Sequence, residues 1–400
     1  MSHLRLTLVL LVALAGPALA DVHPNTAGGF PVDQSFHVGD IDNVNLFNGA
    51  LTVTIPIGPS YPVNGGFSYS LKLVSNSSPW FFQSVHSPNP KTGEDTVYTQ
   101  ANPNPCSNAG LGWRVSLGRF NPPCQSPDAN NVLPGPVYQD EMGTDHVFYP
   151  TLHAGDPEDA AISGVSDVEY TRDGSYLRLK VYVTGGVREV EFPDGMVRKF
   201  DANGMPTEIR DAFGNWLHIT YPVAPDRWVL TDSQGRTQTL YFRNDLPAYG
   251  QVLDRVVVSA FGGSTATYQM SYGSQQIGRG CPNTDVVAPL GQGSTVNVPF
   301  LTGITLPDSS TFQMPLSSYI TALPTNGMCT PSAGNVLGIT LPTLGRMEWT
   351  WQTFNFASGS SVKIHLQSNP GVATRTMRNA AGTVLGTWTY THLPAQPSST

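Results

Sequence analysis

The sequence has 400 residues, of which only 12% are charged, and its formal net charge is −8. An acidic chain lacks the basic surface that nucleic acids and anionic membranes require, so the composition argues against both as partners. Glycine and proline are frequent, at 40 and 34 residues, but the apolar content suffices for a core in a chain of this length.

Residues 1–20 are predicted to be a signal peptide. Arg5 precedes an apolar run, and Ala18-Leu19-Ala20 supplies the small residues of a cleavage site. The run is too short to cross a bilayer as a helix, and no other segment approaches 18 apolar residues. We therefore expect an exported protein that begins at Asp21 and has no transmembrane anchor.

Residues 21–160 are predicted to form an N-terminal β region. Leu51, Val53, Ile55 and Ile57 alternate with other residues, as the buried face of a strand does. Long Pro/Asn-rich loops are expected at 84–105 and 122–136, because turn-forming residues dominate there.

Four cysteines fit an oxidising compartment: Cys106, Cys124, Cys281 and Cys329. Three pairings are possible, and the sequence does not choose among them. Local closure, Cys106–Cys124 and Cys281–Cys329, is the simplest hypothesis because each pair lies in its own loop-rich region. A zinc site is disfavoured, since there is no Cys-x-x-Cys and no histidine beside any cysteine.

An acidic segment near the end of this region contains Asp140, Glu141, Asp145 and His146. These side chains could bind Ca²⁺ or supply paired carboxylates for hydrolysis. The favoured interpretation is a hairpin with Gly143 at its tip, because acidic residues at hairpin tips are ordinarily solvated.

Residues 161–275 are predicted to form a hairpin repeat. Gly174, Gly195, Gly214 and Gly235 follow one another at 21, 19 and 21 residues, a period typical of repeat architectures. An Asp can bond its own turn backbone, and a Gly allows the positive φ that a tight reversal needs. Four Asp-x-x-Gly segments are predicted to be such structural turns: Asp140 to Gly143, Asp201 to Gly204, Asp211 to Gly214 and Asp232 to Gly235.

Residues 276–395 are predicted to form a C-terminal β region, and residues 396–400 a disordered tail. Trp349 and Trp351 alternate with polar residues and are expected to share one face of a strand. Such a pair could stack on sugar rings, although tryptophans in this pattern are more often part of a core.

The fold class follows from how often the chain is interrupted. After residue 20, the longest stretch without Gly or Pro is 346–358, which leaves little room for a helix. We expect an all-β fold in which successive antiparallel hairpins form a large curved sheet or partial shell.

The turn segments FDANG at 200–204 and DAFGNWLHITY at 211–221 resemble the YD-repeat or RHS family of secreted bacterial proteins. Three further parts of the chain, at 44–71, at 110–120 and at the paired segments 304–312 and 339–349, look like the N-terminal and flanking portions of that family. The resemblance implies strands that spiral into a hollow shell, which in some members encloses a toxic C-terminal domain. It also implies a bacterial protein that lies outside the cell, on its surface or in the periplasm.

These observations lead to a functional hypothesis. No nucleophile elbow, Walker loop, HExxH or GxGxxG motif is present, and we expect no cofactor, metal site or catalytic residue. The predicted role is a non-enzymatic surface or secreted scaffold in a toxin-delivery shell, with other secreted proteins or an effector encoded downstream as partners. The alternatives are a carbohydrate-binding adhesin that uses Trp349 and Trp351 on glycans, and a carboxylate-dependent hydrolase.

Overall fold

The structure is a computed structural model that describes residues 28–31, 34–88, 95–125, 135–223, 226–244, 250–278, 295–321, 332–356 and 367–391, with backbone alone at 82–88, 95–101, 355–356 and 367–368. These residues form 26 strands and two short 3₁₀ turns, η1 (Phe261–Gly263) and η2 (Leu316–Ser318). The prediction of an all-β fold is confirmed. No helix within the described ranges has the length and apolar character needed to cross a membrane.

The first sheet has five antiparallel strands in the order β1-β2-β3-β4-β7. Its two long strands place every second side chain on the buried face. In β3, Leu51, Val53, Ile55 and Ile57 are all buried, as predicted. The strands are β1 (Phe36–Val38), β2 (Asp42–Asn45), β3 (Leu51–Asn64), β4 (Phe67–Asn76) and β7 (Trp113–Val115).

The expectation of a long loop over 84–105 is wrong. Strands β5 (Trp80–Pro88) and β6 (Asp95–Pro103) pair antiparallel along their whole length as a two-stranded ribbon. The prolines lie at the ends of the strands, where no ladder hydrogen bond is lost, and residues 95–100 contain the β-branched and aromatic residues that favour pairing.

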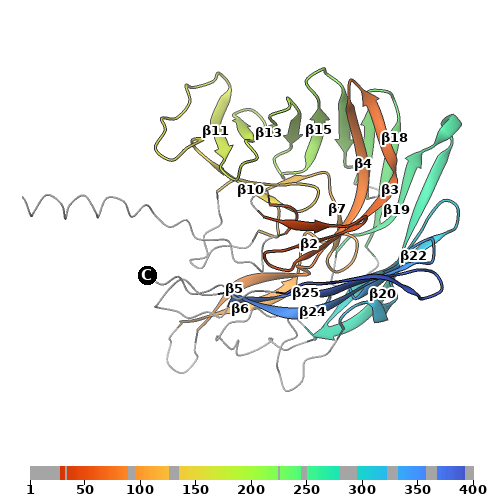
Figure 1. The fold of residues 1–400 in the computed structure, drawn as a ribbon. Coiled ribbons are helices and arrows are strands. Elements are labelled where there is room, and N and C mark those ends of the chain that lie inside the picture. Colours follow the sequence, from red (N-terminus) through yellow and green to blue (C-terminus); the bar gives the residue numbers. More distant parts are fainter. Residues whose placement is uncertain are drawn as a thin grey trace, which may run out of the picture.

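The second sheet is a meander of 19 strands, each paired antiparallel with the strands before and after it in the chain (Figure 1). Among the described pairings none joins the last strand to the first, so the sheet is open and curved. This confirms the predicted succession of hairpins. The strands are β8 (Arg119–Phe120), β9 (Val137–Gln139), β10 (Asp145–Tyr149), β11 (Val165–Thr171), β12 (Arg178–Tyr182), β13 (Arg188–Glu191), β14 (Val197–Phe200), β15 (Pro206–Arg210), β16 (Trp216–Thr220), β17 (Arg227–Asp232), β18 (Thr237–Arg243), β19 (Val252–Ser259), β20 (Thr265–Gly278), β21 (Thr295–Thr305), β22 (Thr311–Gln313), β23 (Gly338–Thr340), β24 (Arg346–Phe356), β25 (Gln367–Arg378) and β26 (Val384–Thr389).

The meander runs through both predicted domain borders. The border at 160/161 falls between β10 and β11, which pair directly, and the border at 275/276 falls within β20. The described strands from β8 to β26 therefore form one continuous sheet rather than two.

The main apolar core lies between the two sheets. Side chains of β3, β4 and β7 form one buried cluster with side chains from β15 to β25, and the N-terminal sheet lies against the curved meander in Figure 1. A smaller cluster, centred on Phe120, Tyr138 and Phe200, covers the first repeat strands. The inner face of the meander is thus covered over much of its extent by the protein's own N-terminal sheet.

Candidate functional site

The four Asp-x-x-Gly turns share one internal hydrogen-bond pattern. In each, the Asp Oδ1 accepts from the backbone N–H groups two and four residues later, at 2.8–3.0 Å. The Gly of each turn has φ between +76° and +97°, a region that only glycine adopts without strain. One oxygen of each carboxylate is therefore held by its own turn. The aspartates are Asp140, Asp201, Asp211 and Asp232, and the glycines are Gly143, Gly204, Gly214 and Gly235.

These turns do not bring their carboxylates into one cleft. Successive turns of a meander lie at opposite ends of the sheet, so Asp201 lies at one end and Asp211 and Asp232 lie at the other. Asp211 and Asp232 are themselves two strands apart, roughly 10 Å at the usual strand spacing.

Asp232 has a second role that Asp211 lacks. Its carboxylate is fully buried, and Oδ2 accepts from the Arg236 Nε at 2.7 Å and from the Tyr69 hydroxyl at 3.0 Å. Tyr69 belongs to β4 of the N-terminal sheet and also accepts from Gln238 at 3.0 Å. This turn therefore joins the two sheets through a buried charge, and burial raises the pKa of Tyr69 so that its hydroxyl remains a donor.

The glycines also differ in their surroundings. A Cβ on Gly214 or Gly235 would meet nothing within 4 Å, whereas one on Gly204 would lie 1.9 Å from the Phe120 carbonyl oxygen of β8. A Cβ on Gly143 would lie 1.5 Å from Arg114 Nη2. Gly143 and Gly204 therefore allow a close approach of neighbouring elements in addition to the turn itself.

The acidic segment is organised around His146, which is buried at the start of β10. Its Nδ1 donates to Asp173 Oδ2 at 2.6 Å, and its Nε2 lies 3.9 Å from Asp140 Oδ2. The ring also stacks on Tyr138. Asp140 and Asp173 belong to neighbouring turns at the same end of the sheet, so one imidazole links the two turns.

The electrostatics favour a charged imidazole. Burial alone would lower the pKa of His146, but the carboxylates of Asp140 and Asp173 outweigh it and raise that pKa to about 9. Burial likewise opposes ionisation of Asp173, yet its bonds to His146 and Ser175 lower its pKa to about 2. A histidine that is already protonated at neutral pH is poorly suited to accept a proton, so this arrangement suits a structural ion pair better than a general base.

Glu141 enters a different contact. Its Oε2 accepts from Arg198 Nη1 at 2.8 Å, and the same guanidinium donates to the Tyr138 hydroxyl. Arg198 comes from β14 and is almost completely buried. Burial would lower its pKa, but Tyr138 and Glu141 outweigh this effect and the pKa is raised. The pair holds the turn after β9 to the repeat strands.

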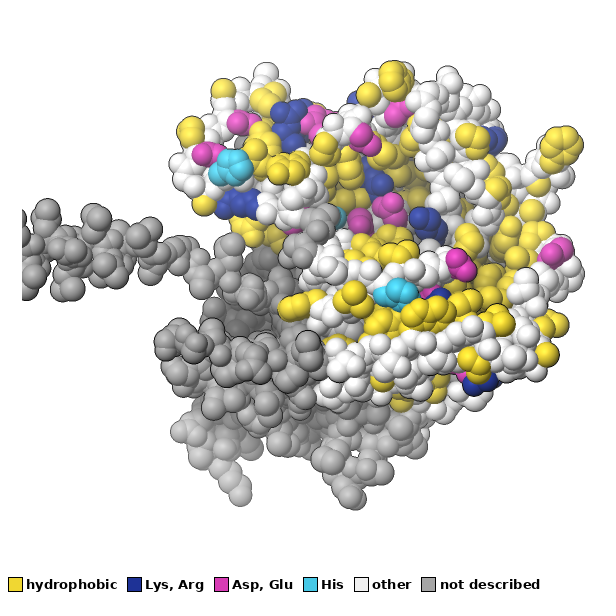
Figure 2. Space-filling view, in the orientation of Figure 1, with side chains coloured by type: hydrophobic (Ala, Val, Ile, Leu, Met, Phe, Trp, Pro, Cys, Tyr) yellow, Lys and Arg dark blue, Asp and Glu magenta, His cyan; other side chains and the backbone are white. Residues whose placement is uncertain are grey.

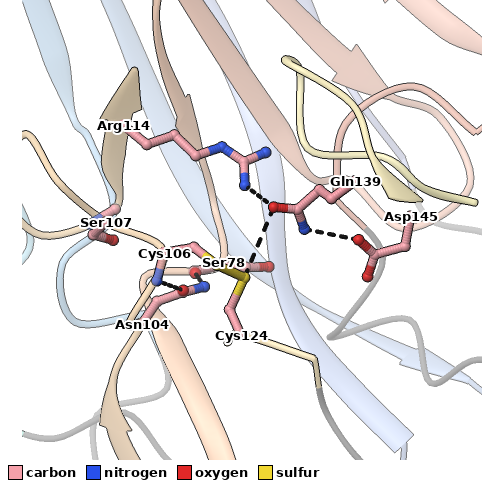
Figure 3. Close-up of a disulfide and its surroundings, with 9 residues drawn as sticks. Ser78, Asn104, Cys106, Ser107, Arg114, Cys124, Gln139 and Asp145 are labelled. Atoms are coloured by element: carbon pink, nitrogen blue, oxygen red, sulfur yellow. Dashed lines mark hydrogen bonds between the residues drawn. A yellow bond between two sulfur atoms is a disulfide. The ribbon is translucent and has the colours of Figure 1, made fainter. Parts of the chain in front are cut away.

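Asp145 belongs to a third contact, beside the predicted Cys106–Cys124 disulfide, which is present (Figure 3). Gln139 donates to Asp145 at 2.7 Å and accepts from Arg114 of β7 at 2.5 Å. The disulfide and this chain of bonds tie the N-terminal sheet to the first strands of the meander. Asp145 itself remains exposed at the start of β10.

A cavity of about 80 Å³ lies next to the disulfide. It is lined by side chains that include Cys106, Asn108, Arg114, Arg119 and Trp228. Its volume has room for a few water molecules. Within the described part of the chain, no three His, Cys, Asp or Glu side chains are placed to hold one metal ion.

The two tryptophans singled out in the sequence face the interior. Trp349 is 1% exposed and donates through Nε1 to Asp42 at 3.1 Å. Trp351 packs on the main core and donates to the Val336 carbonyl at 3.0 Å. Trp349 therefore offers no open face for stacking on a sugar, whereas Trp351 is only partly buried.

Sequence reasoning missed the most deeply buried ion pair among the residues that the structure describes. Asp42 of β2 accepts from Arg375 of β25, with Nη2 at 2.8 Å from Oδ1, and both side chains are almost completely buried. The two residues are 333 positions apart, so no local spacing could indicate the pairing. The sequence of β2, Asp-Asn-Val-Asn, is mostly polar, so nothing in it indicated a buried strand.

Several predicted features lie outside the described residues. They are the signal peptide at 1–20, Cys281, Cys329, the tail at 396–400 and most of the 122–136 segment.

No family model matches the chain, and no curated protein matches it. Among solved structures, the chain is similar to one titled "Crystal Structure of TcdB2-TccC3", with a TM-score of 0.25 and 10% identity over 91% of this chain and 17% of that chain. It is also similar to the N-terminal domain of effector protein SpvB from Salmonella typhimurium strain LT2, with a TM-score of 0.15 and 13% identity over 84% of this chain and 99% of that one. The chain thus spans 17% of the length of the first structure. The description of the fold rests on the chain's own strand pairings.

Proposed function

We propose that the protein is an exported structural scaffold whose repeat sheet is held on its own N-terminal sheet. The observation that carries the proposal is the use of buried charges as inter-sheet contacts. Asp232 bonds Tyr69, and Asp42 bonds Arg375, in each case across the junction between the two sheets. Buried carboxylates with such fixed partners stabilise one arrangement of the sheets, and losing a partner would be costly.

The aspartates of the repeat turns support the same role. Each one bonds its own turn backbone, so we assign to them the reversal of the chain rather than chemistry on a substrate. Export is part of the proposal, because it accounts for both the predicted signal peptide and the Cys106–Cys124 disulfide.

A role in toxin delivery is the finer part of the proposal and follows from the resemblance to YD-repeat proteins. The inner face of the meander over β15–β25 is already packed against the N-terminal sheet. A delivered polypeptide would therefore contact the scaffold elsewhere than on that packed face.

The test is co-expression of the full chain with the polypeptide encoded immediately downstream of it. We expect the two to purify as one complex in which the downstream polypeptide resists a protease that degrades it when it is alone. The variant Asp232→Ala should weaken this protection, because it removes the link to Tyr69, whereas Asp211→Asn should not. Equal degradation with and without the scaffold would refute the delivery role.

The proposed export has a separate readout. Mass spectrometry of the exported protein should find Asp21 as the first residue and Cys106 linked to Cys124. An intact Met1 in the exported protein would contradict the proposed processing.

A further inference from the structure

The turns at one end of the meander carry exposed apolar side chains at a regular interval. Because every strand of the meander pairs antiparallel with the next, the turns that follow its odd-numbered strands all lie at the same end of the sheet. Every second one of these turns presents a large apolar residue to solvent. These residues are Tyr176 (65% exposed), Phe213 (80%), Phe261 (100%) and Leu344 (64%).

We call this set the apolar tips. The turns between them consist of small or polar residues: Pro193-Asp194-Gly195, Ser233-Gln234-Gly235, Pro307-Asp308-Ser309 and Ala380-Ala381-Gly382. After the last of these turns, β26 begins with Val384 and Leu385, which are 47% and 64% exposed. One apolar tip thus occurs every four strands, or roughly every 19 Å at the usual strand spacing. Figure 2 shows hydrophobic side chains protruding at the upper and right margins of the molecule.

Folding alone does not favour these residues at these positions. Tyr176 and Leu344 have φ of 54° and 64°, in the left-handed region where a bulky side chain is strained. Glycine, as found at Gly195, Gly235 and Gly382, would relieve the strain and would expose no apolar surface. Positive-φ strain and the exposure of apolar surface both disfavour these side chains in the isolated molecule. Their presence points to a contact outside the molecule.

The Phe261 tip is the most prominent. Its ring is fully exposed on the turn between β19 and β20, and two glycines follow it with open space around their Cα atoms. The turn is fixed by the Ser264 hydroxyl, which donates to the Phe261 carbonyl at 2.7 Å. The ring is therefore presented on an ordered turn.

The spacing argues against a folded protein as the partner. A stable protein interface buries about 800 Å² on each side in a continuous patch. The apolar tips are single side chains of about 150–250 Å² each for the aromatic ones, and polar turns separate them. A lipid surface requires no continuous patch, because each side chain can enter the headgroup region separately, where aromatic rings are favoured.

The charges around the apolar tips indicate the kind of lipid. The four turns and the residues next to them contribute two aspartates, Asp173 and Asp211, and four arginines, Arg172, Arg178, Arg210 and Arg346. Three of these arginines each pair with a glutamate: Arg178 with Glu191, Arg210 with Glu208 and Arg346 with Glu348. The set therefore lacks the cluster of unpaired basic residues that attracts anionic lipids. We propose that the apolar tips bind the surface of a zwitterionic lipid bilayer, such as phosphatidylcholine.

The opposite end of the sheet provides a matched control. Among the described residues its turns expose aliphatic side chains, including Val183 and Val223, at 70% and 86% exposure, but no large aromatic ring. Replacing these valines removes exposed apolar surface without altering the apolar tips. All four side chains to be replaced are exposed, so the variants should keep the fold.

The experiment is flotation of the full chain with phosphatidylcholine vesicles. We expect the wild-type protein to float, at low salt and at 0.5 M salt alike. The double variant Phe213→Ser/Phe261→Ser should lower the bound fraction about tenfold or more at the same lipid concentration, whereas Val183→Ser/Val223→Ser should leave it unchanged. In Phe261→Trp, phosphatidylcholine with brominated acyl chains should quench fluorescence beyond the quenching seen with wild type.

Three results would overturn the proposal. One is absence of flotation by the wild-type protein, and another is equal flotation by the two double variants. The third is light scattering that shows a wild-type dimer and a monomeric Phe213→Ser/Phe261→Ser variant, because the tips would then serve a second copy of the chain.

Discussion

Alanine substitutions at the four turn glycines would test whether packing against neighbouring strands stabilises the meander. All four have positive φ, but Gly204 lies against the backbone of β8, whereas Gly214 lies beside open space. The two substitutions Gly204→Ala and Gly214→Ala therefore add the same methyl group to similar turns in different surroundings. Any difference between them measures the packing of the turn rather than its conformation.

The magnitude follows from two separate effects. An alanine in the left-handed region costs about 1–2 kcal/mol, and this applies at both positions. At Gly204 the new Cβ would also lie 1.9 Å from the Phe120 carbonyl oxygen, so β8 or the turn must move. Overpacking of this kind costs about 1–3 kcal/mol more. The movement would also strain the hydrogen bond from the Phe120 N–H to the Gly204 carbonyl, which is 2.9 Å long.

The assay is urea-induced unfolding of the wild-type protein and the two variants, followed by near-UV circular dichroism. We expect Gly214→Ala to lower the unfolding midpoint slightly and Gly204→Ala to lower it about twice as far or more. Gly143→Ala should resemble Gly204→Ala, since its Cβ would meet the buried Arg114. Equal effects at Gly204 and Gly214 would show that backbone conformation alone decides the cost and would refute the packing argument.

Three further predictions concern the charged and covalent links. Asp211→Asn should leave the unfolding midpoint nearly unchanged, because an amide oxygen still accepts the turn bonds, whereas Asp232→Asn should cost about 2 kcal/mol or more, because it removes the buried carboxylate that binds both Arg236 and Tyr69; equal losses would contradict this. The pKa of His146 is raised to about 9 from 6.5, so its contribution to stability is complete below pH 6.5 and is lost as the pH rises through 9. His146→Gln should flatten the fall in stability between pH 7 and 10, and an unchanged slope would remove His146 as its cause. Reducing the Cys106–Cys124 disulfide, which spans 18 residues, should cost about 3 kcal/mol, measured as the shift in urea midpoint with and without reductant.

Some features of this protein are local, and the sequence alone was sufficient to predict them. The alternation of Leu217 and Ile219 with His218 and Thr220 indicates a half-buried strand, and β16 buries the first two and exposes the others. The succession of hairpins follows from closely spaced turn residues, since a short connection between strands makes them antiparallel neighbours. The Cys106–Cys124 pairing was likewise favoured as a short loop closure.

Other features depend on residues that meet only in the folded chain. Asp211 and Asp232 have the same turn motif, but only Asp232 accepts a hydrogen bond from Tyr69, which is 163 residues away in sequence. For 84–105, the β-branched and aromatic residues at 95–100 favour pairing, but proline frequency does not show whether the prolines lie at strand ends or within strands.

The acidic segment shows the same division. Its spacing predicts a hairpin, and Asp140 does bond the backbone of the turn at Gly143. Asp145 is exposed at the start of β10, as expected for a solvated acidic residue, but Asp140 is only partly exposed and lies beside the buried His146, which bonds Asp173 of the neighbouring turn. The hydrogen bonds of a turn join residues that are neighbours in the chain, so the local sequence predicts them. Burial of a charge depends on which distant strand packs over it, and only the tertiary structure decides that.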